Sequence, residues 1–285
     1  MPDLKIALVY FSATDVTGSY ARVIAEELGR QGCDVHLLDV TPYAARQVDL
    51  PIDDVDGLIF GFPVFGDFAP SVINDWLPTL QGGGKRCATY FTYGGRTTGY
   101  AHFHTGLLLE RAGFKVQFTA EFLGRHTFNI AGWHALPDRP DEADFAVARE
   151  FAALAVARFA ENAPPAFALQ KPFGYNTAVE MLKQRAKSTT RGWRHPVRSE
   201  GLCSMCRRCE DECPTQAFDA DVGLSDPARC IECMHCVYVC PDKVLHIDER
   251  MRGAYQSFLQ NWRLTEEMMR AKKSKIITAA WQAAF

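Results

Sequence analysis

Eight of the ten cysteines lie between residues 203 and 240, and their spacing is regular. Each group of four follows the pattern C-x2-C-x2-C-x3-C and is followed directly by a proline, which suits the start of a helix. The first group is Cys203, Cys206, Cys209 and Cys213, and the second is Cys230, Cys233, Cys236 and Cys240. Three cysteines set three residues apart can each offer a thiolate to a different corner of an iron–sulfur cubane, while the fourth corner lies beyond the reach of their loop. The spacing predicts two [4Fe–4S] clusters and electron transfer as their chemistry.

Other uses of clustered cysteines fit this pattern less well. A single C-x2-C pair would suit zinc or a redox dithiol, and a dense group in a small secreted protein would suggest disulfides. Two complete four-cysteine motifs, each followed by proline, disfavour zinc. Cys33 and Cys87 stand apart from the motifs, and we expect them to be small buried apolar residues.

Residues 196–248 resemble the bacterial-type two-cluster ferredoxins. The resemblance implies a pseudo-twofold βαββαβ unit with two closely spaced clusters. In that class the fourth cysteine of each motif binds the cluster of the other motif. It therefore implies a cluster 1 on Cys203, Cys206, Cys209 and Cys240, and a cluster 2 on Cys230, Cys233, Cys236 and Cys213.

The first 160 residues alternate short apolar runs with helical patterns. Strands are expected at 5–10, 35–40, 57–61, 87–92 and 115–122, and helices at about 18–30, 70–80, 98–112 and 141–162. This alternation predicts an α/β fold with a doubly wound parallel sheet. Five strands suit the flavodoxin-like order 2-1-3-4-5, in which ligands bind at the carboxyl ends of the strands.

The loop after the first expected strand carries hydroxyl groups where a helix begins. Such a loop, with its free backbone N–H groups, suits a phosphate. It resembles the FMN phosphate loop of flavodoxins, commonly Ser/Thr-x-Thr-Gly-Asn-Thr, and the residues that would hold the phosphate are Ser12, Ala13, Thr14, Asp15, Val16 and Thr17. Ser12, Thr14 and Thr17 match the three hydroxyl positions, whereas Asp15 and Val16 replace Gly and Asn. A carboxylate repels a phosphate, although aspartate tolerates the backbone angles that glycine often supplies.

Two further loops follow expected strands. Pro63, Val64, Phe65 and Gly66 resemble the Pro-Val-Tyr-Gly loop of flavodoxin relatives, with Phe65 in the aromatic place beside the flavin ring. Tyr93, Gly94, Gly95 and Arg96 resemble the loop that runs along the isoalloxazine edge. His126 follows the fifth strand and is expected either as a flavin or substrate contact or as an ordinary loop histidine.

Nearly all of residues 4–248 resemble a flavodoxin–ferredoxin fusion, the family often labelled EFR-type. The resemblance implies a flavodoxin-like FMN domain at 1–162, a basic linker at 163–195, a two-cluster ferredoxin domain at 196–248 and a C-terminal helical extension at 249–285. The linker region 171–198 carries about +6 and residues 200–250 about −6, so the linker is expected either to wrap against the cluster domain or to form a separate solvated surface. Residues 251–285 are expected to be helical, with a one-sided apolar stripe that docks on the protein itself or on a partner.

Three functions stay open on these grounds. The first is an electron-transfer iron–sulfur flavoprotein that serves a redox partner protein. The second is a self-contained flavin enzyme that reduces a quinone, a disulfide or a corrinoid, and the third is a cluster-binding scaffold that has lost FMN. A net charge of −3 gives no reason to expect nucleic acid, and no apolar run is long enough to span a membrane. No signal peptide is visible, so a cytoplasmic location is expected. The sequence leaves a homodimer open and offers no nicotinamide motif and no acid, base or nucleophile constellation for hydrolysis.

Overall fold

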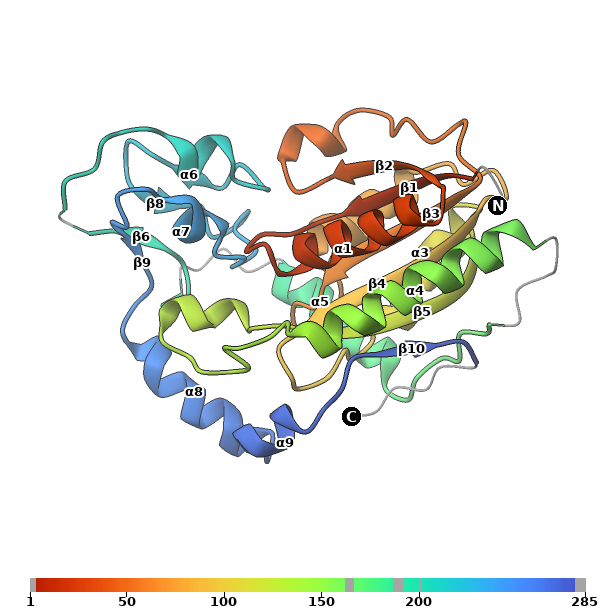
Figure 1. Ribbon diagram of the computed structural model, residues 1–285. Coiled ribbons are helices and arrows are strands. Elements are labelled where there is room, and N and C mark those ends of the chain that lie inside the picture. Colours follow the sequence, from red (N-terminus) through yellow and green to blue (C-terminus); the bar gives the residue numbers. More distant parts are fainter. Residues whose placement is uncertain (1–3, 162–166, 187–191, 200, 280–285) are drawn as a thin grey trace.

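The computed structural model describes residues 4–161, 167–186, 192–199 and 201–279. Figure 1 shows a twisted sheet flanked by helices, with a small domain at one end and two short helices beneath it. We call the first part the sheet domain and the second the cluster domain. Residues 163–166, at the start of the expected linker, lie outside the described residues.

The larger sheet has the expected strand order. It runs β10-β5-β4-β3-β1-β2, and its neighbouring strands are parallel except for β10, which pairs antiparallel with β5. The strands are β1 (Lys5–Tyr10), β2 (Asp34–Asp39), β3 (Gly57–Pro63), β4 (Arg86–Tyr93), β5 (Lys115–Leu123) and β10 (Lys275–Ile277). The order 2-1-3-4-5 is confirmed, because β1 to β5 follow it. The central strands β3 to β5 are almost wholly buried, as parallel strands covered on both faces must be.

Helices cover both faces of this sheet (Figure 1). Helices α1 (Val16–Arg30) and α4 (Glu142–Ala160) pack on one face, where Tyr20 stacks on Phe122 with ring centroids 4.6 Å apart. The other face carries α2 (Ser71–Trp76), α3 (Ala101–Arg111) and α5 (Tyr175–Ala186). Short 3-10 turns are η1 (Tyr43–Arg46), η2 (Leu77–Thr79) and η3 (Thr127–Ala131). Cys33 and Cys87 are buried in this core, as expected.

The cluster domain has the expected βαββαβ order. Its elements are β6 (Val197–Arg198), α6 (Arg208–Asp211), β7 (Phe218–Asp219), β8 (Leu224–Ser225), α7 (His235–Val239) and β9 (Leu245–His246). The strands form an antiparallel sheet in the order β7-β8-β6-β9. The chain is therefore a doubly wound α/β domain followed by a small ferredoxin-type α+β domain.

The C-terminal region corrects one expectation. It was expected to be helical from 251 to 285, but it forms α8 (Arg250–Asn261), α9 (Glu266–Arg270) and then the strand β10. Thr265 caps α9 by accepting a hydrogen bond from the backbone N–H of Met268 at 3.1 Å, which separates the two helices. The chain then extends because β5 offers an open edge for pairing. Residues 280–285 lie outside the described part of the chain.

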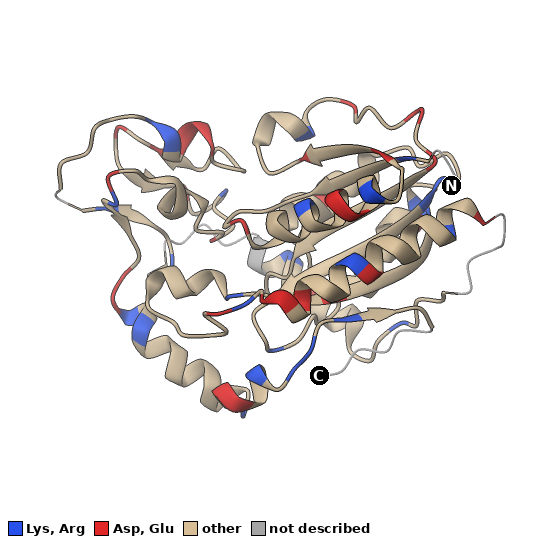
Figure 2. Ribbon diagram, viewed as in Figure 1, with Lys and Arg blue, Asp and Glu red and all other residues tan. Residues whose placement is uncertain are grey.

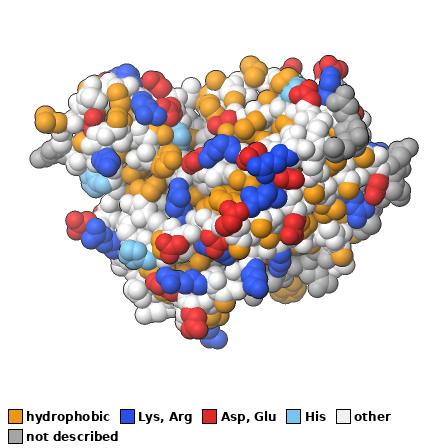
Figure 3. Space-filling model, viewed as in Figure 1, with side chains coloured by type: hydrophobic (Ala, Val, Ile, Leu, Met, Phe, Trp, Pro, Cys, Tyr) orange, Lys and Arg blue, Asp and Glu red, His pale blue; other side chains and the backbone are white. Residues whose placement is uncertain are grey.

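The apolar stripe of α8 docks on the protein itself. Tyr255 and Phe258 lie 5.2 and 5.0 Å from the ring of Trp133, and the indole N–H of Trp133 donates to the carbonyl oxygen of Met251 at 2.7 Å. The basic linker contacts the cluster domain through Arg194, whose Nε lies 3.4 Å from a carboxylate oxygen of Glu232. On the face shown in Figure 3, basic and acidic side chains lie interspersed over the sheet domain.

Candidate cofactor sites

Hydrogen bonds of hydroxyl groups tie the loop between β1 and α1 to neighbouring segments. Ser12 Oγ accepts a hydrogen bond from the backbone N–H of Gly18 at 2.9 Å, and the backbone N–H of Ser12 donates to Thr41 Oγ1 at 2.7 Å. The hydroxyls of Thr17 and Thr92 lie 2.7 Å apart, which ties the start of α1 to the end of β4. The loop therefore stands at the carboxyl edge of the sheet, where α/β folds bind ligands.

Asp15 has the left-handed backbone that glycine would supply in such a loop. It precedes α1 with φ 63° and ψ 3°, and its side chain caps none of the helix N–H groups. Its carboxylate instead accepts two hydrogen bonds from the guanidinium of Arg22, at 3.0 and 2.8 Å. This pairing raises the pKa of Arg22. The negative charge of Asp15 is thus matched by a cation on the outer side of α1.

One cavity of about 1420 Å³ gathers the expected flavin residues. Its lining contains every one of them except Asp15 and Gly95: Ser12, Ala13, Thr14, Val16, Thr17, Pro63, Val64, Phe65, Gly66, Tyr93, Gly94 and Arg96. Residues that were not expected at a flavin site also line it, among them Arg46, Trp76, Thr92, Arg125, Phe128, Trp133, Phe258 and Trp262. Gly95 has φ +87°, and a Cβ there would lie 2.9 Å from Leu136.

His126 and Arg96 stand among aromatic rings at this cavity. The His126 ring lies 4.8 Å from that of Trp133, and its Nδ1 accepts a hydrogen bond from the backbone N–H of Phe128 at 3.1 Å. Burial, and then the nearby charge of Arg96, lowers the pKa of His126 to about 4. Its neutral ring therefore carries the proton on Nε2. The Arg96 guanidinium lies 4.0 Å from the ring centroid of Trp262 and is ion-paired with Asp67.

A second cavity collects the cysteines of the implied cluster 1. Cys203, Cys206 and Cys209 line it together with Cys240, which belongs to the other motif, and Phe218 and Leu245 form part of its wall. Among the described residues no three His, Cys, Asp or Glu side chains converge as ligands of a single metal ion do. Thiolates around a cubane each bind a different iron, so they surround a volume rather than a point. The cavity here is small, about 20 Å³, but its four cysteines are the donors that a cubane takes and they surround a volume in this way.

The remaining four cysteines form their own electrostatic group. Burial, reinforced by the neighbouring cysteine sulfurs, raises the pKa of the thiols of Cys230, Cys233 and Cys236, and Cys213 is among those neighbours in each case. Cys209 is instead affected by Cys240 and Cys206, and burial is the main cause that raises its pKa to about 11. The side chains are thus grouped across the two motifs.

The backbone repeats with the cysteines. Residues with positive φ occur in pairs 27 positions apart, the same offset that separates Cys203 from Cys230: Met205 and Glu232, Arg207 and Met234, and Gln216 and Lys243. Left-handed residues tighten the loop between successive cysteines so that their side chains turn to one side. This repeat is the structural form of the expected pseudo-twofold symmetry.

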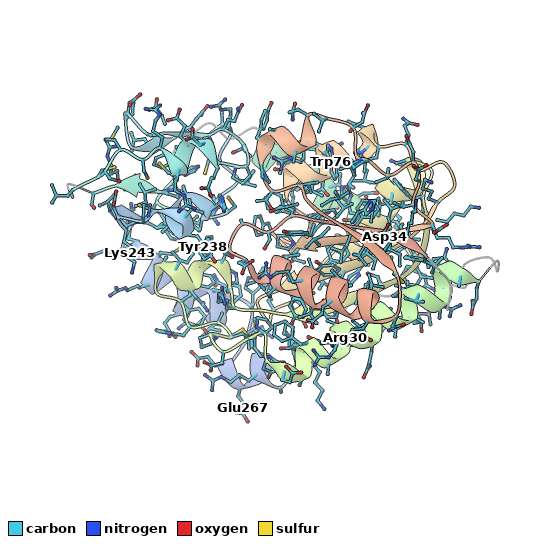
Figure 4. All side chains as sticks on the ribbon, turned by 45° about the horizontal axis from the view of Figure 1, so that its top comes forward. Arg30, Asp34, Trp76, Tyr238, Lys243 and Glu267 are labelled. Atoms are coloured by element: carbon cyan, nitrogen blue, oxygen red, sulfur yellow. The ribbon has the colours of Figure 1, made fainter. Side chains whose placement is uncertain are left out.

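The two cysteine groups differ in their surroundings. Cys206 is exposed, and the helix α6 beside it carries acidic and basic residues at the outer edge of the molecule (Figure 2). Cys213, Cys233 and Cys236 are buried, and Cys233 belongs to a core cluster of the sheet domain. In Figure 4, Tyr238 on α7 lies nearer the sheet domain than Lys243 does.

Known proteins resemble the two parts separately. The family model of a 4Fe-4S dicluster domain matches residues 195–241, which supports an iron–sulfur domain there. No curated protein sequence matches the chain.

Several solved structures are similar to slightly more than half of the chain. The flavodiiron core of Flv1 from Synechocystis sp. PCC6803 is 21% identical with a TM-score of 0.44, covering 55% of this chain and 36% of that one. Flavodoxin 1 from Bacillus cereus is 17% identical with a TM-score of 0.40, covering 54% of this chain and 97% of that one. Rubredoxin oxygen:oxidoreductase from Desulfovibrio gigas is 19% identical with a TM-score of 0.41, covering 54% and 36%. This chain thus spans about a third of the length of the two larger proteins. The fold of this chain is inferred from its own strand order and not from these similarities.

Proposed function

We propose that this protein is an iron–sulfur flavoprotein of the EFR-type flavodoxin–ferredoxin fusion family. It carries electrons between two [4Fe–4S] clusters and FMN and serves a redox partner protein, most simply as the electron donor of a reductase. The 4Fe-4S dicluster match, the flavodoxin-like strand order and the loops at the carboxyl edge of the sheet support this proposal. The domain limits proposed with it are 1–162 for FMN, 163–195 for the linker, 196–248 for the clusters and 249–285 for the extension.

A single observation carries the proposal. The cavity that is lined by the three expected flavin loops is also lined by Cys230, a ligand of the implied cluster 2. The expected flavin site and the implied cluster 2 would therefore adjoin the same cavity. An electron-transfer chain needs its cofactors next to one another, and this arrangement supplies that proximity within one chain.

Different residues around the cavity would bind the phosphate and the ring of FMN. The hydroxyls of Ser12, Thr14 and Thr17 would bind the phosphate at the start of α1. Phe65 and Gly94 would lie along the ring, where the backbone N–H of Gly94 can donate. Bound there, FMN supplies a group that exchanges one or two electrons, whereas each cluster exchanges one.

Cluster 1 would be the outer end of the relay. Cys206 is exposed, so a partner protein can approach this cluster without displacing the sheet domain. Cluster 2 would be the inner end, because its cysteines are buried against that domain.

The alternative function is a self-contained flavin reductase for a small substrate. It is favoured by the size of the cavity, which at about 1420 Å³ exceeds the roughly 300–1,000 Å³ of an ordinary ligand site. The scaffold function is supported by Asp15, whose carboxylate would repel the FMN phosphate. This support is weaker because Arg22 pairs with that carboxylate. No described helix is long and apolar enough to cross a membrane.

Cofactor analysis tests the proposal. The protein is purified without oxygen and incubated with iron, sulfide and FMN. About eight irons and one FMN per chain are expected. Bound zinc without acid-labile sulfide would reject the clusters, and iron without retained FMN would leave only the scaffold function. Turnover of a quinone or disulfide without any partner protein would favour the reductase alternative.

A further inference from the structure

Arg46 is a buried cation that reaches from the sheet domain into the cluster domain. It ends η1, and 8% of its surface is exposed. One guanidinium nitrogen donates to the backbone carbonyl oxygens of Val40 and Thr41, the latter at 2.9 Å, and the other donates to the carbonyl oxygen of Pro214. Pro214 directly follows a ligand of the implied cluster 2.

The charge of Arg46 lies near two cysteines of the implied cluster 2 and also near Asp39. All of its described hydrogen bonds go to backbone carbonyl oxygens and none to a carboxylate. Its guanidinium also lies over the ring of Phe11, 5.7 Å from the centroid. Burial lowers the pKa of Arg46, while Tyr43 and Asp39, and after them Cys233 and Cys213, act on it in the opposite direction.

A fixed cation at this place favours reduction of cluster 2. A cluster becomes more negative by one charge when it is reduced, and the charges, hydrogen bonds and exposure around it set its potential. Burial of Cys213, Cys233 and Cys236 opposes the added charge, because a low-dielectric surrounding disfavours ions. Arg46 offsets this penalty from within the same low-dielectric region, where electrostatic interactions are least screened.

The basic residues near cluster 1 are less well placed to do the same. Arg207 and Arg208 are exposed and each is ion-paired with carboxylates of the cluster domain. Arg198 lines the cluster 1 cavity and donates to the carbonyl oxygen of Ala220 at 2.6 Å, but it comes from the cluster domain and is only half-buried.

We propose that Arg46 is a positioning residue of the relay that raises the reduction potential of cluster 2 selectively, so that an electron rests on the cluster beside the flavin site. This inference depends on the proposed function. Because the same guanidinium hydrogen-bonds to Pro214, the potential of cluster 2 is tied to the docking of the two domains. The outer cluster receives its electron from a one-electron donor protein, and no atom is transferred between the clusters.

A redox titration monitored by electron paramagnetic resonance tests the proposal on the reconstituted holoprotein. The variants are Arg46→Gln, Arg46→Met and Arg46→Lys, with Arg198→Gln as the matched control at cluster 1. The two cluster signals are assigned by comparison with Cys240→Ala, and the iron and FMN contents are measured for each variant. Both neutral replacements are expected to shift the cluster 2 equilibrium about tenfold or more towards the oxidised form, which for one electron is about 59 mV. The reduction potential of cluster 1 is expected to be unchanged in these variants. The reduction potential of cluster 2 in Arg46→Lys is expected to stay near the wild-type value.

The possible results distinguish three roles of Arg46: its charge, its hydrogen bond to Pro214 and a role in cluster assembly. Equal shifts in Arg46→Gln and Arg46→Met support the charge, because only glutamine can still donate to Pro214. An unchanged cluster 2 potential, or an equal shift of both clusters, overturns the proposal. Loss of iron from both neutral variants also overturns it, since Arg46 would then serve assembly. Failure of the wild-type protein to hold two clusters is a different result and rejects the proposed function itself.

Discussion

His235 Nδ1 lies 2.7 Å from the carbonyl oxygen of Ala13, although 222 positions separate the two residues. Ala13 belongs to the loop expected to bind the FMN phosphate, and His235 lies between two cysteines of the implied cluster 2. The other ring nitrogen of His235 lies 3.6 Å from a carboxylate oxygen of Glu212, next to Cys213. One imidazole thus joins the flavin loop to both segments that supply cluster 2.

The pairing of Asp15 with Arg22 predicts how the phosphate loop responds to charge. Asp15→Asn keeps a residue that tolerates positive φ and removes the carboxylate, so FMN should bind about three- to tenfold more tightly. Arg22→Gln leaves that carboxylate unpaired and should weaken binding. The gain is limited because both side chains are about half exposed and water screens them. Quenching of flavin fluorescence gives the dissociation constants.

The control for this pair is Asp54→Asn, which removes an exposed charge remote from the cavity and should not alter FMN affinity. Tighter binding by Arg22→Gln would contradict the account of the loop.

Crossed ligation of the clusters predicts a particular pattern of iron loss. Cys240→Ala should lower the iron content from about eight to about four atoms per chain. In that background, Cys206→Ala should remove no further iron, whereas Cys230→Ala should remove what is left. Cys33→Ala, a buried cysteine outside the motifs, serves as the control and should retain all the iron. Ligation within each motif predicts the reverse result for the two double variants.

His126, which is partly buried at the cavity, predicts a loss of stability in mild acid. Burial, and then Arg96, lowers its pKa to about 4, below the 6.5 or so of an unfolded chain. Between these values the unfolded chain binds a proton that the folded one does not, so stability rises with pH through this window and falls as the pH drops from 6.5 towards 4. His126→Gln should reduce the stability lost between pH 7 and pH 5 by about 1–2 kcal/mol, measured by urea unfolding.

The matched control is His134→Gln, because His134 is exposed on the same segment. An identical pH dependence in wild type and His126→Gln would show that His126 is not kept neutral by the fold.

Ser274 fastens the C-terminal strand to the sheet domain. Its hydroxyl donates to an oxygen of Asp144 at 2.5 Å and accepts from the backbone N–H of Leu123 at 2.9 Å. Ser274→Ala leaves both groups buried without this partner and should lower the free energy of unfolding by about 1–3 kcal/mol. Ser257 lies on the exposed side of α8, and Ser257→Ala should change the free energy of unfolding by less than about 0.5 kcal/mol. Equal stability of the two variants in urea would show that the hydrogen bonds of Ser274 do not stabilise the fold.

Local patterns were enough to predict most of the fold. The strands β1 to β5 begin and end within two residues of the expected limits, because each is an apolar run bounded by polar loops. The strand β10 could not be found in this way. Its three residues follow a run of lysines, and what makes them a strand is the open edge of β5, which is more than 150 positions away.

The residues that line the cavity also divide into those that local patterns predict and those that they do not. Its three loops could be predicted because each follows a strand of the sheet, whereas Arg46, Phe258 and Trp262 come from segments that reach it only through tertiary packing. The break between α8 and α9 did have a local signal, since Thr265 followed by two glutamates is a helix start.

The proposed function requires that electrons pass between the clusters and FMN within one chain through cluster 2. The direct measurement is rapid mixing of the reconstituted protein with a one-electron donor under anaerobic conditions, at several protein concentrations, while the flavin absorbance is followed. Wild-type protein should show a flavin reduction phase whose rate does not depend on protein concentration, and Cys230→Ala, which removes cluster 2, should lose that phase while FMN stays bound. A flavin reduction rate that rises in proportion to protein concentration, or that survives the loss of cluster 2 unchanged, would contradict electron transfer through cluster 2 within one chain.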